Sequence, residues 1–493
     1  MAVTLTVLLT ASKSHPNAAE LRRRLVGGDW GVKLDVVDLW DMEGEDAQLA
    51  LVDDADLVVG LSHPSTDVAR PLLERIDQRL DADDLVAVLL NGTGAPPRKA
   101  TIPARFLPLD GDDLERLSRP RRLFRVDESL DAPEAWAQAE EQIRRVLNWL
   151  ATPGVSEVYV NNLGPILSSS LELSPGITVL LGTNGAGKSW LMKVLYAALQ
   201  VPAGDAQFEH HRRHIADRLV SLFRPDDDRL GRLVRRSCPT ATVRVSREGG
   251  RLEFELQPDG SLTPSGGVLL RTRSQVFIPS RESLAMFDGF MPLYNKYGLS
   301  FDSTHADLCE HLATPELRAP RGSRATSILA DLEAMLGGKI GLKGGHFVRA
   351  SPDGEIEAHL LSEGQRKVGT LARLLANGVL TRGSVLFWDE PEANMNPRLI
   401  SRFAELIDKL GSLGVQIILT THDHLLAQRL SLAAEYGTAS TSRQFVSFFR
   451  HPDGGFVTET AGTLAELEHN DLLDEHVSLY DDERALALRR LVG

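Results

Sequence analysis

An apolar run followed at once by a glycine-rich turn constrains this chain more than any other feature. Residues 177–181 read Ile-Thr-Val-Leu-Leu, the pattern of a buried β-strand. Residues 182–189 then read Gly-Thr-Asn-Gly-Ala-Gly-Lys-Ser, which matches G-x-x-x-x-G-K-[S/T]. Between a strand and a helix, such a loop closes its backbone N–H groups on phosphate, and the helix directs its positive end toward the same charge. The sequence therefore predicts a phosphate-binding loop in an α/β fold.

The last residues of this loop carry the charge and metal chemistry. Lys188 should reach the β- and γ-phosphates of a nucleoside triphosphate. Ser189 offers a hydroxyl to Mg²⁺, whose small octahedral shell is filled mostly by water and phosphate oxygens. A glycine turn that binds nothing is the alternative. The nucleotide-binding residues predicted in this motif are Gly182, Asn184, Gly185, Gly187, Lys188, Ser189 and Trp190.

A second apolar run ends in two acidic residues. Residues 385–390 read Val-Leu-Phe-Trp-Asp-Glu, a buried strand whose end lies where ligands of parallel α/β sheets bind. We expect Asp389 to hold Mg²⁺, directly or through water, and Glu390 to orient and deprotonate the attacking water. Adjacent strand residues point to opposite faces, but the turn at the strand end can direct both toward one site. An acidic surface turn is the alternative.

Two further segments follow the phosphate-binding loop. Residues 361–365 read Leu-Ser-Glu-Gly-Gln and precede a helix with one apolar face, so Ser362 is a candidate N-cap. Residues 417–423 read Ile-Ile-Leu-Thr-Thr-His-Asp, an apolar strand that ends at His422. Taken alone, the first segment is consistent with a bare helix cap and the second with an ordinary histidine. Their order along the chain argues against coincidence.

This order resembles that of the ABC-class ATPases, over roughly 158–430. Residues 361–365 stand where that family has its signature sequence Leu-Ser-Gly-Gly-Gln, shortly before the Asp-Glu strand. The resemblance implies an ABC-type head that binds ATP and Mg²⁺ and hydrolyses ATP to ADP and phosphate. Glu363 departs from the commonest signature, and Trp190 departs from the small hydroxyl residue common after Ser189. The hydrolysis would depend on Glu390, His422 and Lys188.

The same resemblance implies a site completed between subunits. In ABC-class ATPases the signature contacts the γ-phosphate bound by the other subunit, so Ser362 and Gly364, with Gln365, would act in trans. A helix N-terminus facing phosphate is the physical reason. His422 would touch the γ-phosphate or the water. We therefore expect a homodimer, or a higher homo-oligomer, formed head to tail through the ATPase heads.

The segment after the two carboxylates indicates a branch of the family. Residues 391–397 read Pro-Glu-Ala-Asn-Met-Asn-Pro. This looks like the overcoming-lysogenization-defect, RecF and chromosome-maintenance branch, and like bacterial defence ATPases, rather than membrane transporters. The resemblance implies ATP-driven dimerisation that controls an effector in anti-phage defence or a toxin system, the effector lying in the amino-terminal part or in a separate protein. The alternatives are a DNA-repair or chromosome-maintenance ATPase, and an ATP-gated scaffold with little turnover.

A shorter strand and loop, residues 276–282, resembles the segment that couples nucleotide state to the lid in these ATPases. Gln275 precedes it and Glu282 ends it, and both are candidates for the family's glutamine. A plain strand end is an equal alternative.

The predicted fold class is an α/β P-loop NTPase, an ABC-type head over 154–493 with a helical lid inserted at about 201–345. A small Rossmann-like or TIR-like α/β domain over 1–153 precedes it. In that domain, strand 57–61 and the following Ser62 to Ser65 resemble the Toll/interleukin-receptor layout, which makes Glu74 a candidate for an NAD-cleaving or nucleotide-binding site. A surface glutamate on an interaction domain is the alternative.

Composition bounds the partners. A formal net charge of -14 argues against attraction of the whole surface to nucleic acid or to an anionic membrane. A local basic groove would still allow nucleic acid to bind. Two cysteines are too few for a disulfide framework, and no apolar run approaches the roughly 20 residues that span a bilayer. We therefore expect a cytoplasmic protein with no membrane partner.

Overall fold

The chain forms two compact units. One contains Met1–Thr152, Pro315–Asp331 and Leu375–Gly383, and the other contains Pro153–Thr314, Leu332–Leu374 and Ser384–Gly493. The computed structural model describes residues 4–9, 18–27, 33–38, 48, 57–62, 86–91, 123–126, 140, 143, 154–201, 208–247, 250–265, 274–297, 299–317, 323–471, 473–475, 477–478 and 481–484.

The first unit contains a parallel five-stranded sheet. Its strand order is β2-β1-β3-β4-β5, and every neighbouring pair is parallel. This order is that of the flavodoxin-like doubly wound folds, in which ligands bind where the strand order reverses. Glu74 lies outside the described residues, so its role stays a prediction. The described elements are β1 (Thr4–Leu9), α1 (Ala18–Gly27), β2 (Lys33–Asp38), β3 (Leu57–Ser62), β4 (Val86–Asn91) and β5 (Leu123–Val126).

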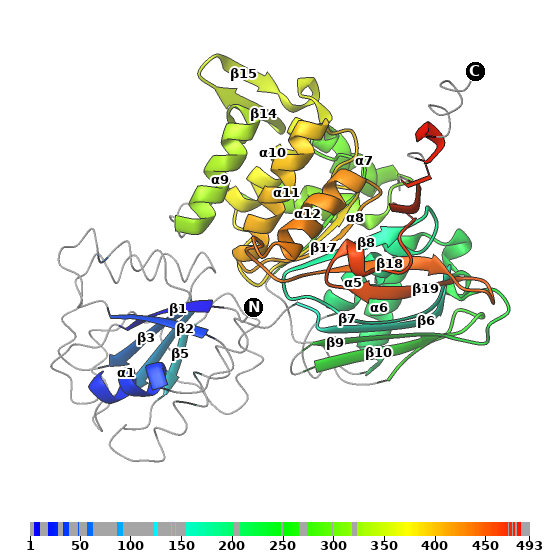
Figure 1. The fold of residues 1–493 in the computed structure, drawn as a ribbon, viewed down its shortest axis with the longest axis horizontal. Helices are drawn as coiled ribbons and strands as arrows, with labels where there is room; N and C mark the ends of the chain where they lie inside the picture. Colours follow the sequence, from blue (N-terminus) through cyan, green and yellow to red (C-terminus); the bar gives the residue numbers. More distant parts are fainter. Residues whose placement is uncertain are drawn as a thin grey trace. The chain divides into compact units, whose positions relative to one another are not determined.

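The second unit is built on a mixed 11-stranded sheet (Figure 1), so the prediction of an α/β fold is confirmed. Its order is β11-β10-β9-β6-β7-β19-β18-β8-β17-β16-β12, with parallel pairing from β18 to β12. The strands are β6 (Glu157–Leu163), β7 (Ile166–Glu172), β8 (Ile177–Gly182), β9 (Ala241–Arg247), β10 (Gly250–Leu256), β11 (Leu262–Pro264), β12 (Gln275–Ile278), β16 (Val385–Asp389), β17 (Gln416–Thr420), β18 (Arg443–Arg450) and β19 (Phe456–Ala461).

Burial along the strands follows their place in this sheet. Every residue of β8 and β17 is buried, as expected of parallel strands that are covered on both faces. In β9, buried and half-buried residues alternate, as in an antiparallel strand with one face toward water. Phe277 of β12 and Phe387 of β16 are paired in register, and their rings stack at 6.0 Å. The continuous apolar runs of the sequence therefore mark the centre of the sheet.

The segment 201–345, expected to be one helical lid, is divided between the sheet and its surroundings. Its strands β9, β10, β11 and β12 all pair within the 11-stranded sheet, because their apolar faces complete the same core as β6. The parts outside that sheet are α6 (Phe208–Phe223), α7 (Phe287–Tyr297), α8 (Ser303–Ala313), α9 (Ser323–Leu336) and a separate three-stranded sheet of β13 (Lys339–Lys343), β14 (His346–Ser351) and β15 (Gly354–Glu357).

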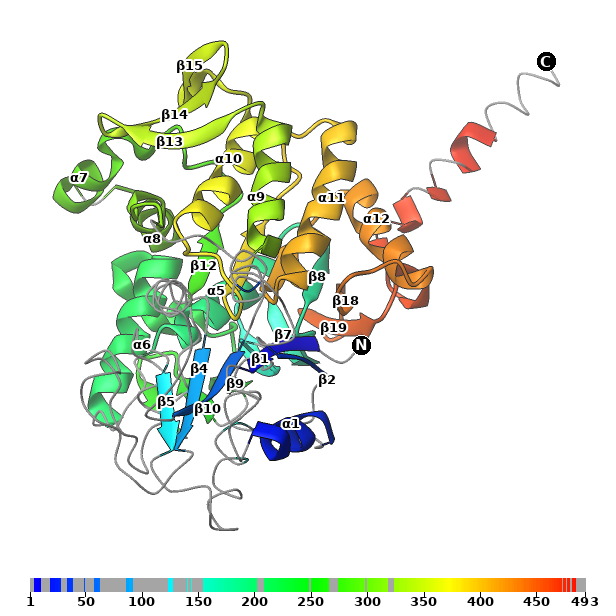
Figure 2. The ribbon, with the colours of Figure 1, turned by 90° about the vertical axis from the view of Figure 1, so that its left-hand side faces the viewer.

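Four helices position the residues of interest. Their bounds are α5 (Lys188–Leu199), α10 (Glu363–Ala376), α11 (Pro397–Ser412) and α12 (His424–Glu435). Asn396 caps α11 by accepting from Leu399 N, and Asp423 caps α12 by accepting from Leu426 N. Helix α11 packs against α12 (Figure 1 and Figure 2). None of the helices in the described part of the chain is long and apolar enough to cross a membrane.

Candidate functional site

The glycine-rich loop joins β8 to α5, as predicted. Gly182 has a φ of 130° and Gly187 a φ of 109°, conformations that residues with a side chain rarely adopt. A Cβ atom at Gly182 would lie 2.5 Å from the carbonyl oxygen of Phe448, and one at Gly187 would lie 2.6 Å from Cγ1 of Ile166. Both positions therefore require glycine, for backbone conformation and for space. Gly185 has a φ of 79° with open space around it, and Asn184 is exposed beside it.

Lys188 folds back over its own loop. Its Nζ donates hydrogen bonds to the carbonyl oxygens of Gly182, at 2.7 Å, and Thr183, at 2.9 Å. Burial lowers the pKa of Lys188 to about 8, although the nearby Asp389 and Glu390 oppose that shift. The ammonium thus lies at the mouth of the loop, where incoming phosphate oxygens would replace carbonyl acceptors and restore its usual pKa.

Two oxygen-bearing side chains meet at the predicted metal position. Ser189 Oγ donates to both carboxylate oxygens of Asp389, at 3.0 and 3.1 Å. Thr420 Oγ1 donates to Asp389 Oδ1 at 2.7 Å, because β16 and β17 place these two residues opposite one another. Hydroxyl and carboxylate oxygens suit Mg²⁺, which is typically held by one or two protein ligands together with phosphate and water. The donor set fits that ion.

Glu390 and His422 face one another beyond the ends of β16 and β17. His422 Nε2 lies 3.7 Å from Glu390 Oε1, and their side chains are 31% and 38% exposed, so water can reach both. Burial lowers the pKa of His422, and the Lys188 ammonium adds to this. The imidazole is therefore neutral at physiological pH. Glu390 has a left-handed φ of 49°, and its N–H donates to Thr420 Oγ1 at 3.0 Å.

Three residues that the sequence analysis did not single out support this geometry. Thr420 Oγ1 donates to the carboxylate of Asp389 and accepts from the backbone N–H of Glu390. Buried Glu392 accepts from Thr421 Oγ1 at 2.7 Å and from His422 N at 3.1 Å, and burial raises its pKa. Lys367 is also buried and bonds the loop after Asp389. The only sequence signal for the first two was their place at the ends of the two central strands.

The signature residues form the start of α10. Ser362 N donates to Gln365 Oε1 at 3.1 Å, and Gln365 N donates to Ser362 Oγ at 3.3 Å. This reciprocal arrangement is a capping box. Ser362 is exposed, whereas Gly364 is buried, and a Cβ there would lie 2.7 Å from Cδ2 of Leu399. Within one subunit, Gly364 thus lets α10 approach α11.

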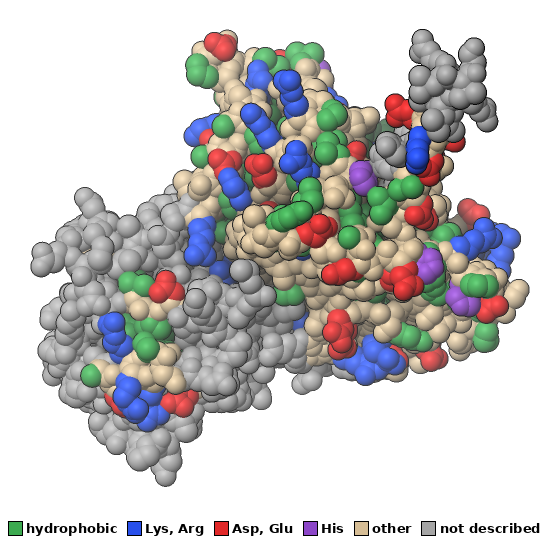
Figure 3. All heavy atoms as spheres, in the orientation of Figure 1, with side chains coloured by type: hydrophobic (Ala, Val, Ile, Leu, Met, Phe, Trp, Pro, Cys, Tyr) green, Lys and Arg blue, Asp and Glu red, His purple; other side chains and the backbone are tan. Residues whose placement is uncertain are grey.

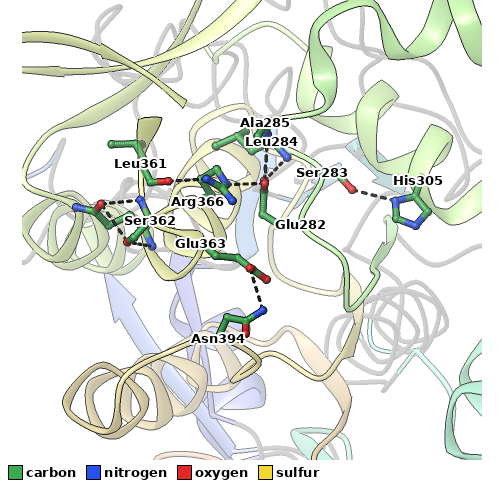
Figure 4. Close-up of polar contacts among 11 residues, drawn as sticks. Glu282, Ser283, Leu284, Ala285, His305, Leu361, Ser362, Glu363, Arg366 and Asn394 are labelled. Atoms are coloured by element: carbon green, nitrogen blue, oxygen red, sulfur yellow. Dashed lines mark hydrogen bonds and ion pairs between the residues drawn. The ribbon is translucent and has the colours of Figure 1, made fainter. Parts of the chain in front are cut away.

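The two candidates around β12 lie in different places. Gln275 pairs with Val385 at the start of the parallel strands, at the end of the sheet opposite to Asp389, so the structure does not bring it to the P-loop. Glu282 lies beyond β12, and its carboxylate forms an ion pair with Arg366 of α10, with 2.6 Å between Arg366 Nε and Glu282 Oε2 (Figure 4). Glu282 therefore contacts the signature helix.

Trp190 packs beside the loop. Its ring lies 4.8 Å from that of Phe223 of α6, and a Cβ on Gly164 would lie 2.4 Å from the indole. The indole is thus held between α6 and the turn after β6, and it remains partly exposed.

Part of the chain matches a known family. Residues 250–427 match the family described as "AAA domain, putative AbiEii toxin, Type IV TA system". A "Putative ABC transporter ATP-binding protein" of Methanosarcina acetivorans is 41% identical over 76 residues, which cover 15% of this chain and 26% of that protein. A protein of the same description from Streptomyces coelicolor is 34% identical over 114 residues, 23% of this chain and 34% of that protein. The chain thus spans about a quarter to a third of these curated relatives.

Solved structures of low similarity include two heads of SMC proteins. An Smc head bound to the C-winged helix domain of ScpA has 14% sequence identity and a TM-score of 0.41, over 64% of this chain and 99% of that one. An SMC head domain from Thermotoga maritima has 14% identity and a TM-score of 0.36, over 63% and 98%. Over 250–427 the chain is thus similar to AAA-type ATPase domains, and its glycine-rich loop at 182–189, which precedes this match, has the P-loop pattern.

Proposed function

We propose that the chain binds ATP with Mg²⁺ and hydrolyses it to ADP and phosphate. The observation that carries this proposal is the meeting of the P-loop, Asp389, Glu390 and His422 at the carboxyl ends of β8, β16 and β17. A bound ATP would place its phosphates on the N–H groups of the loop and on Lys188. When bound, Mg²⁺ would neutralise phosphate charge beside Ser189 and Asp389.

In this proposal Glu390 is the general base. Its carboxylate orients a water molecule and accepts its proton as the water oxygen bonds to the γ-phosphorus, while the bond from that phosphorus to the ADP oxygen breaks. His422, neutral and beside Glu390, is in reach of the same water or of a γ-phosphate oxygen. Lys188 balances the charge that develops on the phosphate.

We also propose that two copies pair head to tail to complete each site. Exposed Ser362, at the N-terminus of α10, would face the γ-phosphate on the partner subunit. The first experiment compares the mass of the purified protein with and without ATP, for wild type and Glu390→Gln. We expect Glu390→Gln to bind ATP and accumulate as a dimer. An unchanged mass for both proteins would contradict ATP-driven pairing, and a stable wild-type dimer without turnover would favour an ATP-gated scaffold.

For its biological role, we propose that ATP-driven pairing controls an effector in anti-phage defence or a toxin system. The toxin–antitoxin description of the matching family and the amino-acid sequence of 391–397 support this choice. We expect a bacterial host that expresses the chain with its neighbouring genes to form fewer phage plaques, and Lys188→Ala to abolish that protection. Equal plaque numbers with and without the chain, over a broad phage panel, would contradict the defence role.

A role in DNA repair or chromosome maintenance is the alternative. It requires a basic surface, whereas the chain has a net charge of -14 and acidic and basic side chains are interspersed over the described face in Figure 3. ATP-dependent DNA binding that weakens steeply with salt would favour this alternative over the effector proposal.

A further inference from the structure

A buried lysine ties the signature helix to the loop that carries Glu390. Lys367 lies in the second turn of α10, and the residue is only 2% exposed. Its Nζ donates to the carbonyl oxygens of Glu390 at 3.1 Å, Pro391 at 3.4 Å and Ala393 at 2.9 Å. The three N–H donors of the ammonium are thus matched to three carbonyls of one short loop.

These bonds hold a charge that is costly to bury. Burial lowers the pKa of Lys367, because the desolvated ammonium is disfavoured. Among the described residues, no carboxylate forms an ion pair with its Nζ, and Glu363, Glu392 and Glu390 act on it only at longer range. An apolar side chain of similar length would fill this space without that cost. The lysine therefore serves the geometry of the loop more than the stability of the core.

The geometry in question is the backbone of Glu390. Its left-handed φ of 49° is unfavourable for a residue with a side chain and persists only where the surroundings enforce it. Its N–H donates to Thr420 Oγ1 of β17, and its carbonyl accepts from Lys367 Nζ of α10. With both backbone groups held from opposite sides, the direction of its Cα–Cβ bond, from which the carboxylate extends, is fixed as well.

The same loop is fastened to α10 at two more points. Asn394 Nδ2 donates to Glu363 Oε2 at 2.9 Å, as Figure 4 shows. Gly364 packs against Leu399 and Met395, the latter 3.5 Å from a Cβ placed on the glycine. The loop 390–396 and the first turns of α10 therefore form one packed element.

We propose that Lys367 is a positioning residue that aims the Glu390 carboxylate and joins loop 390–396 to the signature helix. Movement of α10 on pairing with a second subunit would then be transmitted to the general base through the Lys367 ammonium. This inference rests on the proposed role of Glu390 in ATP hydrolysis.

The test compares Lys367→Met with Lys193→Met in the full chain. Lys193 is a matched control because it is also mostly buried and donates to a carbonyl, that of Leu222, and to Asp302, but it does not contact loop 390–396. For Lys367→Met we expect kcat to fall about 10- to 100-fold, as for a misplaced catalytic group, with the Kd for ATP changed less than about threefold. We expect Lys193→Met to retain most of the wild-type kcat.

A second variant and a second measurement keep the test decisive. Lys367→Gln keeps two N–H donors without the charge, so we expect an intermediate kcat, and it replaces Lys367→Met if that variant does not fold. Amide hydrogen exchange should become faster in 390–396 but not in the P-loop. Wild-type kcat together with unchanged exchange in both variants would overturn the inference. Wild-type turnover by Glu390→Gln would instead contradict the proposed function, while the exchange result would still test the link between Lys367 and the loop.

Discussion

Thr420 Oγ1 donates a 2.7 Å hydrogen bond to the carboxylate of Asp389, the residue opposite it on the neighbouring strand. The same hydroxyl oxygen accepts the N–H of Glu390 at 3.0 Å. One buried hydroxyl thus orients the proposed magnesium ligand and the backbone of the proposed general base. Thr420, at the end of β17, therefore positions both the proposed magnesium ligand at the end of β16 and the proposed general base that follows it.

Thr420→Val removes this hydroxyl with little change in shape. We expect kcat for ATP hydrolysis to fall about tenfold and the Mg²⁺ concentration for half-maximal activity to rise. The unpaired Glu390 N–H should also cost about 1–3 kcal/mol of folding stability. A magnesium titration of activity and a urea unfolding curve measure these effects.

Thr178→Val is the control for this change. Thr178 lies on β8 and is equally buried, but its hydroxyl has no hydrogen-bond partner among the described residues. This variant should be as stable as wild type, or more stable. Equal effects of the two substitutions would show that the Thr420 hydroxyl has no special role.

The pKa of Lys188, lowered by burial to about 8, predicts a pH-dependent affinity for ATP. The charged ammonium binds phosphate, so bound ATP raises the pKa and binding takes up a proton above about pH 8. The Kd for ATP should stay nearly constant below about pH 8 and then rise, approaching about tenfold per pH unit. Calorimetry in buffers of different ionisation enthalpy measures the proton uptake.

Lys188→Met should bind ATP more weakly and lose this dependence on pH. Proton uptake that persists in that variant would have to come from another group.

Buried Glu392 makes the folding stability of the protein fall as pH rises, whereas a salt-bridged carboxylate makes it rise. Because burial raises its pKa in the folded protein, its contribution to stability is present below the unfolded pKa and is lost as pH rises through the folded pKa. Glu392→Gln keeps an acceptor for Thr421 Oγ1 and His422 N and cannot ionise. The melting temperature of Glu392→Gln should therefore increase relative to that of wild type as pH rises. A difference in melting temperature that does not change with pH would contradict a buried ionisation at Glu392.

The ion pair between Glu282 and Arg366 predicts unequal effects of removing either partner. Their side chains are 6% and 18% exposed, and burial raises the pKa of Glu282 even beside the guanidinium. Arg366→Met leaves a buried carboxylate without its cation and should cost about 3–5 kcal/mol. Glu282→Gln should cost less, because Arg366 also donates to the carbonyl of Leu361.

A double-mutant cycle measured by urea unfolding tests this pair. The double variant should be more stable than Arg366→Met alone, because it no longer contains the unpaired carboxylate. Additive losses would show that the two side chains are not coupled.

Local sequence was sufficient to predict that a glycine-rich loop lies between a strand and a helix and that two carboxylates lie at the end of another buried strand. A phosphate-binding loop is one continuous segment, and the central parallel strands bring Asp389 close to Ser189 because their carboxyl ends meet at one edge of the sheet. The strands β9 to β12 could not be placed in the same way. Strands β9 and β12 pair with β6 and β16, which are far away in the sequence, while β10 and β11 extend the sheet from β9. A half-buried antiparallel strand such as β9 has the same alternating pattern in a lid as in a core sheet.

The supporting residues were harder to predict because their environment is created by other segments. Lys367 follows Arg366 in a helix, where two adjacent cations are normally solvated. Loop 390–396 buries Lys367 by turning three carbonyls toward it, and no pattern within α10 encodes that contact. Gln275 and Glu282 were equivalent candidates because one precedes and the other follows the same short strand, and only the register of β12 against β16 separates them.

The position of β8 in the large sheet has a consequence for synthesis of the chain. Its two neighbours, β17 and β18, begin roughly 230 and 260 residues after it ends. At about 5–20 residues per second, a ribosome needs on the order of 10–50 s to make them, and during that time β8, whose residues are all buried in the folded chain, has no partner on either side. The phosphate-binding loop is therefore translated early and takes its final shape late, and the unpaired strand that precedes it is exposed to aggregation during that interval.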